Sequence, residues 1–181
     1  SSAIPVAPAA PAPRAAIAKG TAEFKRSNRA LFFGGFSTFS LLYCIQPLFP
    51  LLSHQFHLTP AQSSWSLSVS SGLLAISLVL LSAVSDRIGR KPLMVASMFS
   101  AAILTILSAF AQDYAQLLAI RAALGIALGG MPAVAMAYLG EEIEGPSLGL
   151  SMGLYIAGSA FGGMSGRLIA SMLSDFLSWR W

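Results

Sequence analysis

One short charged stretch, Ser82-Ala83-Val84-Ser85-Asp86-Arg87-Ile88-Gly89-Arg90-Lys91-Pro92, interrupts a long run of apolar sequence. The apolar segments on either side are long enough to cross a bilayer, so the stretch is expected to turn the chain at a membrane surface. Gly89 can adopt the positive φ of a tight reversal, and Pro92 suits the first turn of a following helix. The three basic residues of the stretch place the turn on the cytoplasmic side.

The composition predicts a membrane protein. Of the 181 residues, 55% are apolar and 10% are charged, and the mean hydropathy is +0.71. A soluble domain usually carries about 25% charged residues, so this chain is expected to face lipid. The net charge of +4 does not indicate a nucleic-acid partner, because most basic residues precede the first apolar run or lie in the charged turn.

The apolar runs predict five membrane spans that follow an Ala/Pro-rich tail. Residues 1–28 are expected to form a disordered tail, and the basic residues before the first span place the N-terminus in the cytoplasm. Residues 29–181 are then expected to form a transmembrane domain. The predicted helices span residues 30–52, 61–85, 92–111, 115–139 and 147–173.

The charged stretch resembles the loop between the second and third helices of the major facilitator superfamily, G-x-x-x-D-R-x-G-R-K. An ordinary positive-inside loop would explain the basic residues, but not the Asp, the Gly and their spacing. The resemblance covers residues 30–181. It implies an all-α membrane protein whose five helices form most of the N-terminal six-helix half, with the C-terminal half as a missing partner. The matching residues are Asp86, Arg87, Gly89, Arg90 and Lys91, with Ser82 in place of the first glycine.

Arg121 lies inside the fourth predicted span, about 9 Å along a helix from Ala115. A charge at this depth is costly unless it faces water or a partner, which favours a functional role; the alternative is snorkelling to the outer headgroups. The segment Arg121-x-x-x-Gly125-x-x-x-Gly129 resembles the fourth-helix motif of drug exporters in this family. There the arginine faces the central cavity and is tied to proton coupling, which makes Arg121 a candidate substrate or coupling residue.

A polar stripe along the first span includes Tyr43 and Gln46, followed by Pro47 and Pro50. This stripe could line a substrate path, or it could only pack against another helix; the sequence does not decide between these readings. The two prolines are expected to bend or fray the span. His54 and His57 have no third ligand in their loop, so neither a metal site nor a cofactor is predicted.

An acidic loop after the fourth span contains Glu141 and Glu142. The alternation of the spans places it on the same, cytoplasmic side of the membrane as the charged turn. In the family reading, either glutamate could pair with Arg87, Arg90 or Lys91 and clamp two helix ends together. The alternative is a solvated loop, and an exposed pair would contribute less than about 1 kcal/mol.

The fifth span is dense in glycines, which predicts a close-packing face that needs a partner helix. Nothing in this chain obviously covers that face, so the missing half is expected to do so. The segment Gly158-Ser159-Ala160-Phe161-Gly162-Gly163 resembles the G-P-x-x-G-G motif of the exporter branch, with Ser159 at the proline position. Arg167 is expected to snorkel at the outer end. The face comprises Gly149, Gly153, Gly158, Gly162, Gly163 and Gly166.

Together these features predict the N-terminal part of a secondary transporter in a bacterial inner membrane. The family resemblance implies proton-coupled efflux of small organic molecules by alternating access, with the lipid bilayer as its environment. No acidic residue lies in the middle of a predicted span, so the proton site would lie in the missing half or at Asp86. The alternative is a five-helix scaffold or a truncated product. An enzyme is not predicted, because the only histidines lack a neighbouring carboxylate.

Overall fold

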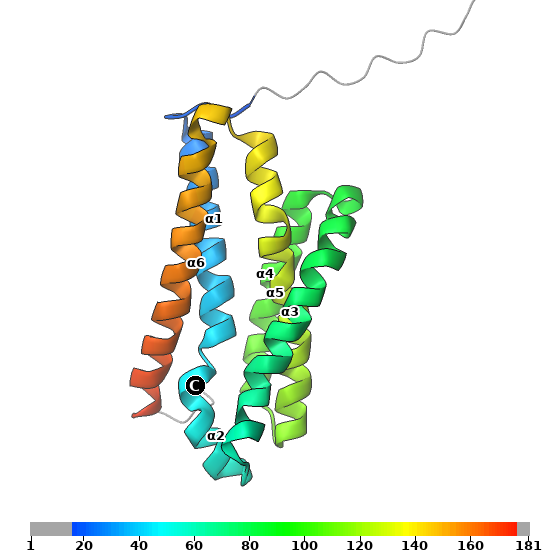
Figure 1. Ribbon diagram of the computed structural model, residues 1–181, viewed down its shortest axis with the longest axis vertical. Coiled ribbons are helices and arrows are strands. Elements are labelled where there is room, and N and C mark those ends of the chain that lie inside the picture. Colours follow the sequence, from blue (N-terminus) through cyan, green and yellow to red (C-terminus); the bar gives the residue numbers. More distant parts are fainter. Residues whose placement is uncertain (1–15, 177–181) are drawn as a thin grey trace, which may run out of the picture.

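The computed structural model describes residues 16–176, and within them the chain is an elongated bundle of helices (Figure 1). The helices follow the long axis of the molecule, and strand pairing in the described part is limited to one bridge between Ile17 and Ile143. The elements are α1 (Ala22–Tyr43), η1 (Gln46–Leu48), α2 (Phe49–Phe56), α3 (Pro60–Ile88), α4 (Arg90–Ser108), α5 (Tyr114–Glu142) and α6 (Gly145–Ser174).

The first helix begins earlier than the sequence analysis predicted. The side-chain oxygen of Thr21 accepts a hydrogen bond of 3.1 Å from the backbone N–H of Phe24 and caps the helix. Phe24 and Asn28 are buried, so packing also supports this turn. The predicted tail of residues 1–28 is therefore corrected, because α1 starts at Ala22; residues 1–15 lie outside the described part.

The first span is interrupted near its far end. Helix α1 stops at Tyr43, and the chain passes through η1 before α2 continues to Phe56. Pro47 lies in η1 and has no N–H to offer the carbonyl of Tyr43, which explains why the helix does not run through. The sequence predicted a bend here but placed the end of the span at residue 52.

The charged turn between α3 and α4 is as short as a turn can be. Gly89 alone separates the two helices, and its φ of 97° with ψ of 149° is a positive-φ conformation that glycine adopts without strain. Helix α4 then starts at Arg90, with Pro92 in its first turn. At its other end, α3 begins with a capping box in which Thr59 and Gln62 bond reciprocally.

Four segments of the described chain are long and apolar enough to cross a membrane: Ala22–Phe56, Pro60–Ile88, Arg90–Ser108 and Tyr114–Glu142. Helix α6 has 30 residues but is diluted by glycine and serine, and it is not among these four. It runs beside α1 along the bundle and so spans a comparable length (Figure 1). The all-α membrane fold predicted from the sequence is confirmed.

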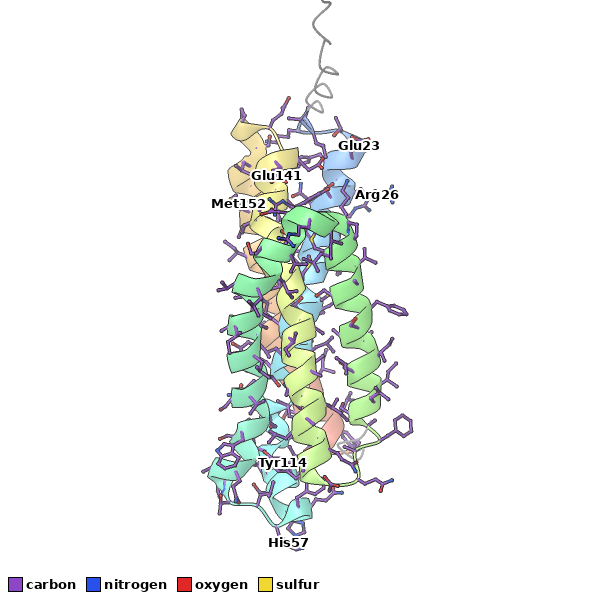
Figure 2. All side chains as sticks on the ribbon, turned by 90° about the vertical axis from the view of Figure 1, so that its right-hand side faces the viewer. Glu23, Arg26, His57, Tyr114, Glu141 and Met152 are labelled. Carbon is purple, nitrogen blue, oxygen red and sulfur yellow. The ribbon has the colours of Figure 1, made fainter. Side chains whose placement is uncertain are left out.

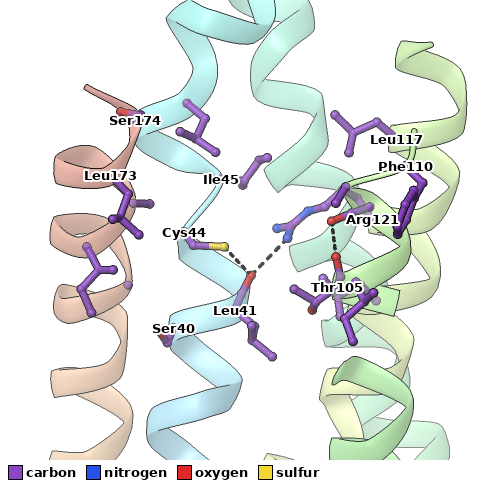
Figure 3. A pocket seen from close by; sticks show the side chains of 18 residues that line it. Ser40, Leu41, Cys44, Ile45, Thr105, Phe110, Leu117, Arg121, Leu173 and Ser174 are labelled. Atoms are coloured by element: carbon purple, nitrogen blue, oxygen red, sulfur yellow. Dashed lines mark hydrogen bonds between the residues drawn. The ribbon is translucent and has the colours of Figure 1, made fainter. Parts of the chain in front are cut away.

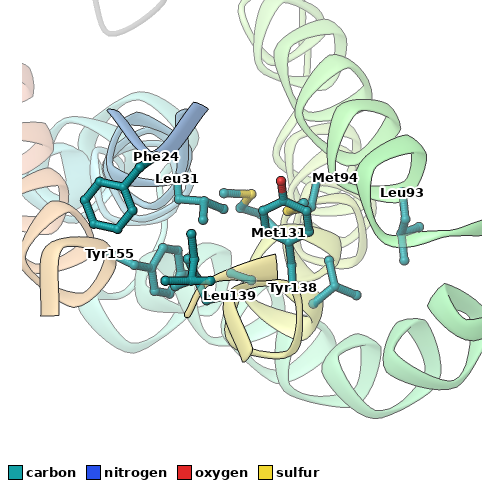
Figure 4. Close-up of a cluster of buried hydrophobic side chains, with 11 residues drawn as sticks. Phe24, Leu31, Leu93, Met94, Met131, Tyr138, Leu139 and Tyr155 are labelled. Atoms are coloured by element: carbon teal, nitrogen blue, oxygen red, sulfur yellow. The ribbon is translucent and has the colours of Figure 1, made fainter. Parts of the chain in front are cut away.

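The bundle consists of two packed groups. Helix α6 lies against α1, and α5 lies between α3 and α4 (Figure 1). A cluster of buried apolar side chains joins the two groups near one end, where Phe24 and Leu31 of α1 meet Tyr138 of α5 and Tyr155 of α6 (Figure 4). We call this the charged end, because Glu23, Arg26 and Glu141 lie there, and we call the other the histidine end, after His57 (Figure 2).

The glycine face of α6 is covered by this chain itself, contrary to the sequence-based expectation. Gly158, Gly162 and Gly166 lie against the backbone of α1 at Phe32, Phe36 and Ser40, so closely that a methyl group at any of them would overlap that backbone. Glycines four residues apart allow this approach because they leave a flat strip along the helix.

The glycines at the start of α6 differ from those in its middle. Gly149 and Gly153 have no neighbour within 4 Å of where a Cβ would lie, so they do not belong to the close-packed face. Gly163 lies beside the ring of Tyr43, where a Cβ would be 3.3 Å from the nearest ring atom.

Candidate functional site

Arg121 lies on α5 and points at the broken end of α1 (Figure 3). The residue is only 3% exposed. Its two Nη atoms donate hydrogen bonds to successive carbonyls of α1, of 3.1 Å to Leu41 and 2.7 Å to Leu42. Its Nε donates a longer bond of 3.4 Å to the carbonyl of Ser66 on α3. The side chain thus links three helices through their backbone.

These bonds have a clear physical cause. The last carbonyls of a helix have no intrahelical donor, and in an apolar environment each unsatisfied carbonyl is costly. Because α1 ends at Tyr43, the carbonyls of Leu41 and Leu42 need donors from elsewhere, and the planar fork of Arg121 provides them.

Of the two alternatives that the sequence offers for Arg121, the arrangement fits a residue that faces protein partners, but these partners are backbone carbonyls. The side chain does not snorkel toward headgroups, and no carboxylate in residues 16–176 lies within 4 Å of it. The signal that could have revealed the role was the pairing of a membrane-embedded arginine with Pro47, which predicts a helix break that requires hydrogen-bond donors.

The approach of α5 to α3 positions Arg121. Gly125, one turn further along α5, lies directly against the backbone of Ser70. The hydroxyl of Ser70 donates to the carbonyl of Arg121 at 2.9 Å and also bonds the carbonyl of Ser66 on its own helix at 2.8 Å. The backbone of α5 at Arg121 is therefore held against α3, both by the hydrogen bond from Ser70 and by the close approach of Gly125.

A cavity of about 520 Å³ opens beside Arg121 between α1, α4, α5 and α6 (Figure 3). Its walls are mainly apolar, with polar atoms from Arg121, Ser40 and Thr105. Cys44 also lines it, and its Sγ donates to the carbonyl of Leu41 at 3.3 Å. The cavity thus lies at the point where the first span is interrupted.

Tyr43 and Gln46, the other predicted site residues, do not join Arg121 but contact Arg167. The Cζ of Arg167 lies 4.2 Å from the centroid of the Tyr43 ring, and its Nε donates to Oε1 of Gln46 at 2.6 Å. The sequence predicts only snorkelling for Arg167 and gives no sign of this cluster. Only the packing of α6 on α1 brings the three residues together, since Arg167 lies 121 positions after Gln46 and still further from Tyr43 in sequence.

The charged end contains a clamp, which we define as Asp86, Arg90 and Glu141. Nε and Nη2 of Arg90 donate to the two carboxylate oxygens of Glu141 at 2.7 and 2.5 Å, and Asp86 lies 3.4 Å from Nη2. Nη1 of Arg90 also bonds the hydroxyl of Ser85 at 2.9 Å. The clamp joins the α3–α4 turn to the end of α5 in a bidentate geometry.

The other charged residues that the sequence predicts for this clamp do not take part in it. Nζ of Lys91 lies 5.4 Å from the centroid of the Tyr138 ring, and Arg87 is exposed. Glu142 contributes its backbone carbonyl, which accepts a bond of 2.7 Å from the N–H of Ile17. That bond belongs to the Ile17–Ile143 bridge, which ties the residues before α1 to the α5–α6 connection.

The sequence of this chain is similar to that of known membrane transport proteins. The family model of the major facilitator superfamily matches residues 31–181. The chain is 49% identical to "Inner membrane transport protein YnfM" of Escherichia coli (strain K12), over 93% of this chain and 40% of that protein. It is 48% identical to "Uncharacterized MFS-type transporter YybF" of Bacillus subtilis (strain 168), over 90% of this chain and 40% of the relative.

A more distant relative is "Multidrug resistance protein MdtG" of Proteus mirabilis (strain HI4320), 30% identical over 87% of this chain. The chain spans about two fifths of the length of these relatives. The match confirms the resemblance that the charged turn and the glycine-rich segments indicated. This chain belongs to the major facilitator superfamily and corresponds to the N-terminal portion of a member of that family.

Proposed function

We propose that this chain forms most of the N-terminal half of a secondary transporter that exports small organic molecules by alternating access. The observation that carries the proposal is the interruption of the first span at Cys44 and Ile45, beside the Arg121 cavity. Backbone carbonyls without intrahelical donors are tolerated at membrane depth only where protein groups or a water-filled cavity satisfy them. Transporters commonly build substrate sites at such broken helices.

In this proposal, Arg121 keeps the break open. Its bonds to Leu41 and Leu42 satisfy the carbonyls that would otherwise favour a continuous helix. The helix break is therefore maintained and forms part of the wall of the substrate path. Tyr43 and Gln46 form a further part of that wall. Arg121 acts here as a positioning residue.

The clamp has a different role in alternating access. Transport requires one helical half to rock against the other as a unit, so the helices of each half must move together. Arg90 and Glu141 fix the ends of α4 and α5 to each other, and Asp86 adds the end of α3. The exposed Arg87 is then available to contact the C-terminal half in one of the two states.

We further propose that protons drive export. Every acidic residue in the described part lies at or near a helix end, so the group that carries the proton would be Asp86 or a residue of the C-terminal half. The relative MdtG is named as a multidrug resistance protein, which supports export of small organic molecules. The relative YnfM is named as an inner membrane transport protein, which supports the same location here. The basic residues of the turn and of the N-terminal segment favour a cytoplasmic charged end and N-terminus.

Everted membrane vesicles that contain the full-length transporter test this proposal. We expect the vesicles to accumulate at least one compound from a library of small organic cations, anions and neutral molecules when respiration supplies a proton gradient, and a protonophore should abolish the accumulation. Vesicles that hold inserted protein but accumulate nothing beyond empty vesicles would instead favour the scaffold alternative. Accumulation that a protonophore does not reduce would refute proton coupling alone.

A further inference from the structure

Arg167 is held on the surface of the α1–α6 pair by uncharged partners. It lies seven residues before the end of α6, which places it about 10 Å inside that end. Its guanidinium lies over the Tyr43 ring at 4.2 Å and bonds Gln46 at 2.6 Å. A weaker bond of 3.4 Å runs from Nη1 to the carbonyl of Gly163. The arginine is therefore oriented without being neutralised.

The charge of Arg167 has no carboxylate within 4 Å in residues 16–176, where both ion pairs belong to Arg90. The other arginine at a comparable depth, Arg121, is buried and fully engaged with carbonyls. Arg167 is exposed. An exposed guanidinium at this depth is costly unless it faces water or an anion or snorkels to the headgroups, and the bonds to Gln46 and Gly163 hold this one against α1 and α6.

The surroundings of Arg167 are preorganised to receive an anion. Phe39 stacks on Tyr43 with ring centroids 6.3 Å apart, and the absent side chain of Gly163 leaves room for the Tyr43 ring. The ring supports one face of the guanidinium, and Gln46 fixes its Nε. Nη2 of Arg167 forms no hydrogen bond within the described residues. Its N–H groups are therefore free to bind a group outside this chain, next to α6. A planar fork held in this way fits a carboxylate.

We propose that Arg167, Gln46 and Tyr43 form an anion-binding station in the substrate path, and that the exported molecules carry a carboxylate or a similar anionic group. This inference rests on the proposed function, since it requires a water-filled path beside α1 and α6. A carboxylate from the C-terminal half is the other source of the same chemistry, and the experiment separates the two.

The test uses charged thiol reagents on the full-length transporter, with Cys44→Ser as background. Ser171→Cys places a thiol one turn beyond Arg167 on the same face of α6, at an exposed position. Ala61→Cys, exposed in the first turn of α3, is the matched control. At each position we compare the labelling rate of the anionic sulfonatoethyl methanethiosulfonate with that of its cationic trimethylammonium analogue. We expect the ratio of the anionic to the cationic rate to be about tenfold higher at Ser171→Cys than at the control. Arg167→Gln should abolish this preference, and Arg167→Lys should retain most of it.

Competition tests binding at the same position. We expect benzoate, but not its uncharged isostere benzamide, to slow labelling of Ser171→Cys by the anionic reagent, and Arg167→Gln should remove the effect. Equal labelling preferences at the two positions would mean that an internal carboxylate already neutralises Arg167, which overturns the station. The station is also overturned if benzoate does not slow labelling by the anionic reagent. The positive electrostatic potential of Arg167 would then attract the reagent without any anion-binding site.

Failure of the station and failure of the proposed function give different results. If Ser171→Cys reacts only with the neutral, membrane-permeant methyl methanethiosulfonate, no water path reaches this face and the station is refuted, whereas accumulation by the vesicles still decides the proposed function. If both charged reagents react without preference while the vesicles still export, the transporter stands and only the anionic cargo is refuted.

Discussion

Removing the fork of Arg121 should destabilise the bundle by an amount that the structure bounds. In Arg121→Leu, the carbonyls of Leu41 and Leu42 lose donors at 3.1 and 2.7 Å, and the bond to Ser66 at 3.4 Å is too long to add much. Hydrogen bonds to charged groups are worth about 1.5–3 kcal/mol in proteins, but buried bonds between membrane helices average about 0.6 kcal/mol. Two bonds therefore predict a loss of about 1–6 kcal/mol. Arg121→Lys should lose about half as much, because one ammonium group can serve one of the two carbonyls well.

The assay is the free energy of unfolding of the full-length protein in mixed detergent micelles, measured by titration with a denaturing detergent. Arg29→Leu is a suitable control, because this arginine is exposed and bonds only the carbonyl of Lys25 within its own helix. It should change the free energy of unfolding by less than about 0.5 kcal/mol.

A double-mutant cycle with Pro47→Ala isolates the mechanism. The alanine restores a backbone N–H, so α1 can continue and supply its own donors to the carbonyls of Leu41 and Leu42. Arg121→Leu should then cost at least about 1 kcal/mol less in the Pro47→Ala background than in the parent. An equal cost in both backgrounds, or no cost in the parent, would refute the idea that Arg121 satisfies the broken helix end.

Three further outcomes follow from the packing, the clamp and the orientation. Gly162→Ala should destabilise the α1–α6 contact by about 1–3 kcal/mol because the added methyl group overlaps α1, whereas Gly153→Ala, at an open helical position, should be neutral or stabilising by up to about 1 kcal/mol. Unfolding titrations measure both free energies, and equal values would contradict the observed register of α6 on α1. Glu141→Gln should cost less than about 1 kcal/mol because the carboxylate is 57% exposed, yet it should slow transport in vesicles by uncoupling α4 from α5; full transport would remove the clamp from the mechanism. A thiol at Asp113→Cys, in the Cys44→Ser background, should react with impermeant reagents only from the periplasmic side, and labelling from the cytoplasm alone would invert the proposed topology.

The order of the membrane helices could be predicted from the sequence because it depends on local properties. Apolar length specifies a span, and a charged stretch with a glycine specifies a turn. The reversal at Gly89 follows from its own conformational freedom, and the break near Pro47 follows from its missing N–H. The start of α1 was less visible, because the burial of Phe24 that supports it depends on helices distant in sequence.

The candidate site depended on contacts that no local pattern reveals. The sequence identified Arg121, Tyr43 and Gln46 as unusual polar residues in an apolar chain, but it could not tell which of them would meet. Arg121 joined the carbonyls of α1, whereas Tyr43 and Gln46 joined Arg167. The direction of each side chain depends on the rotation of its helix, and that rotation is set by packing.

The glycines of α6 show the same division. Their spacing determined that this helix would lie close to another, because small residues four apart leave a strip without side chains. The tertiary structure decided that the partner is α1 and that contact begins at Gly158 and not at Gly149. Local chemistry thus determined which residues would be costly to leave without partners in a membrane, and only the three-dimensional packing determined which partners satisfied them.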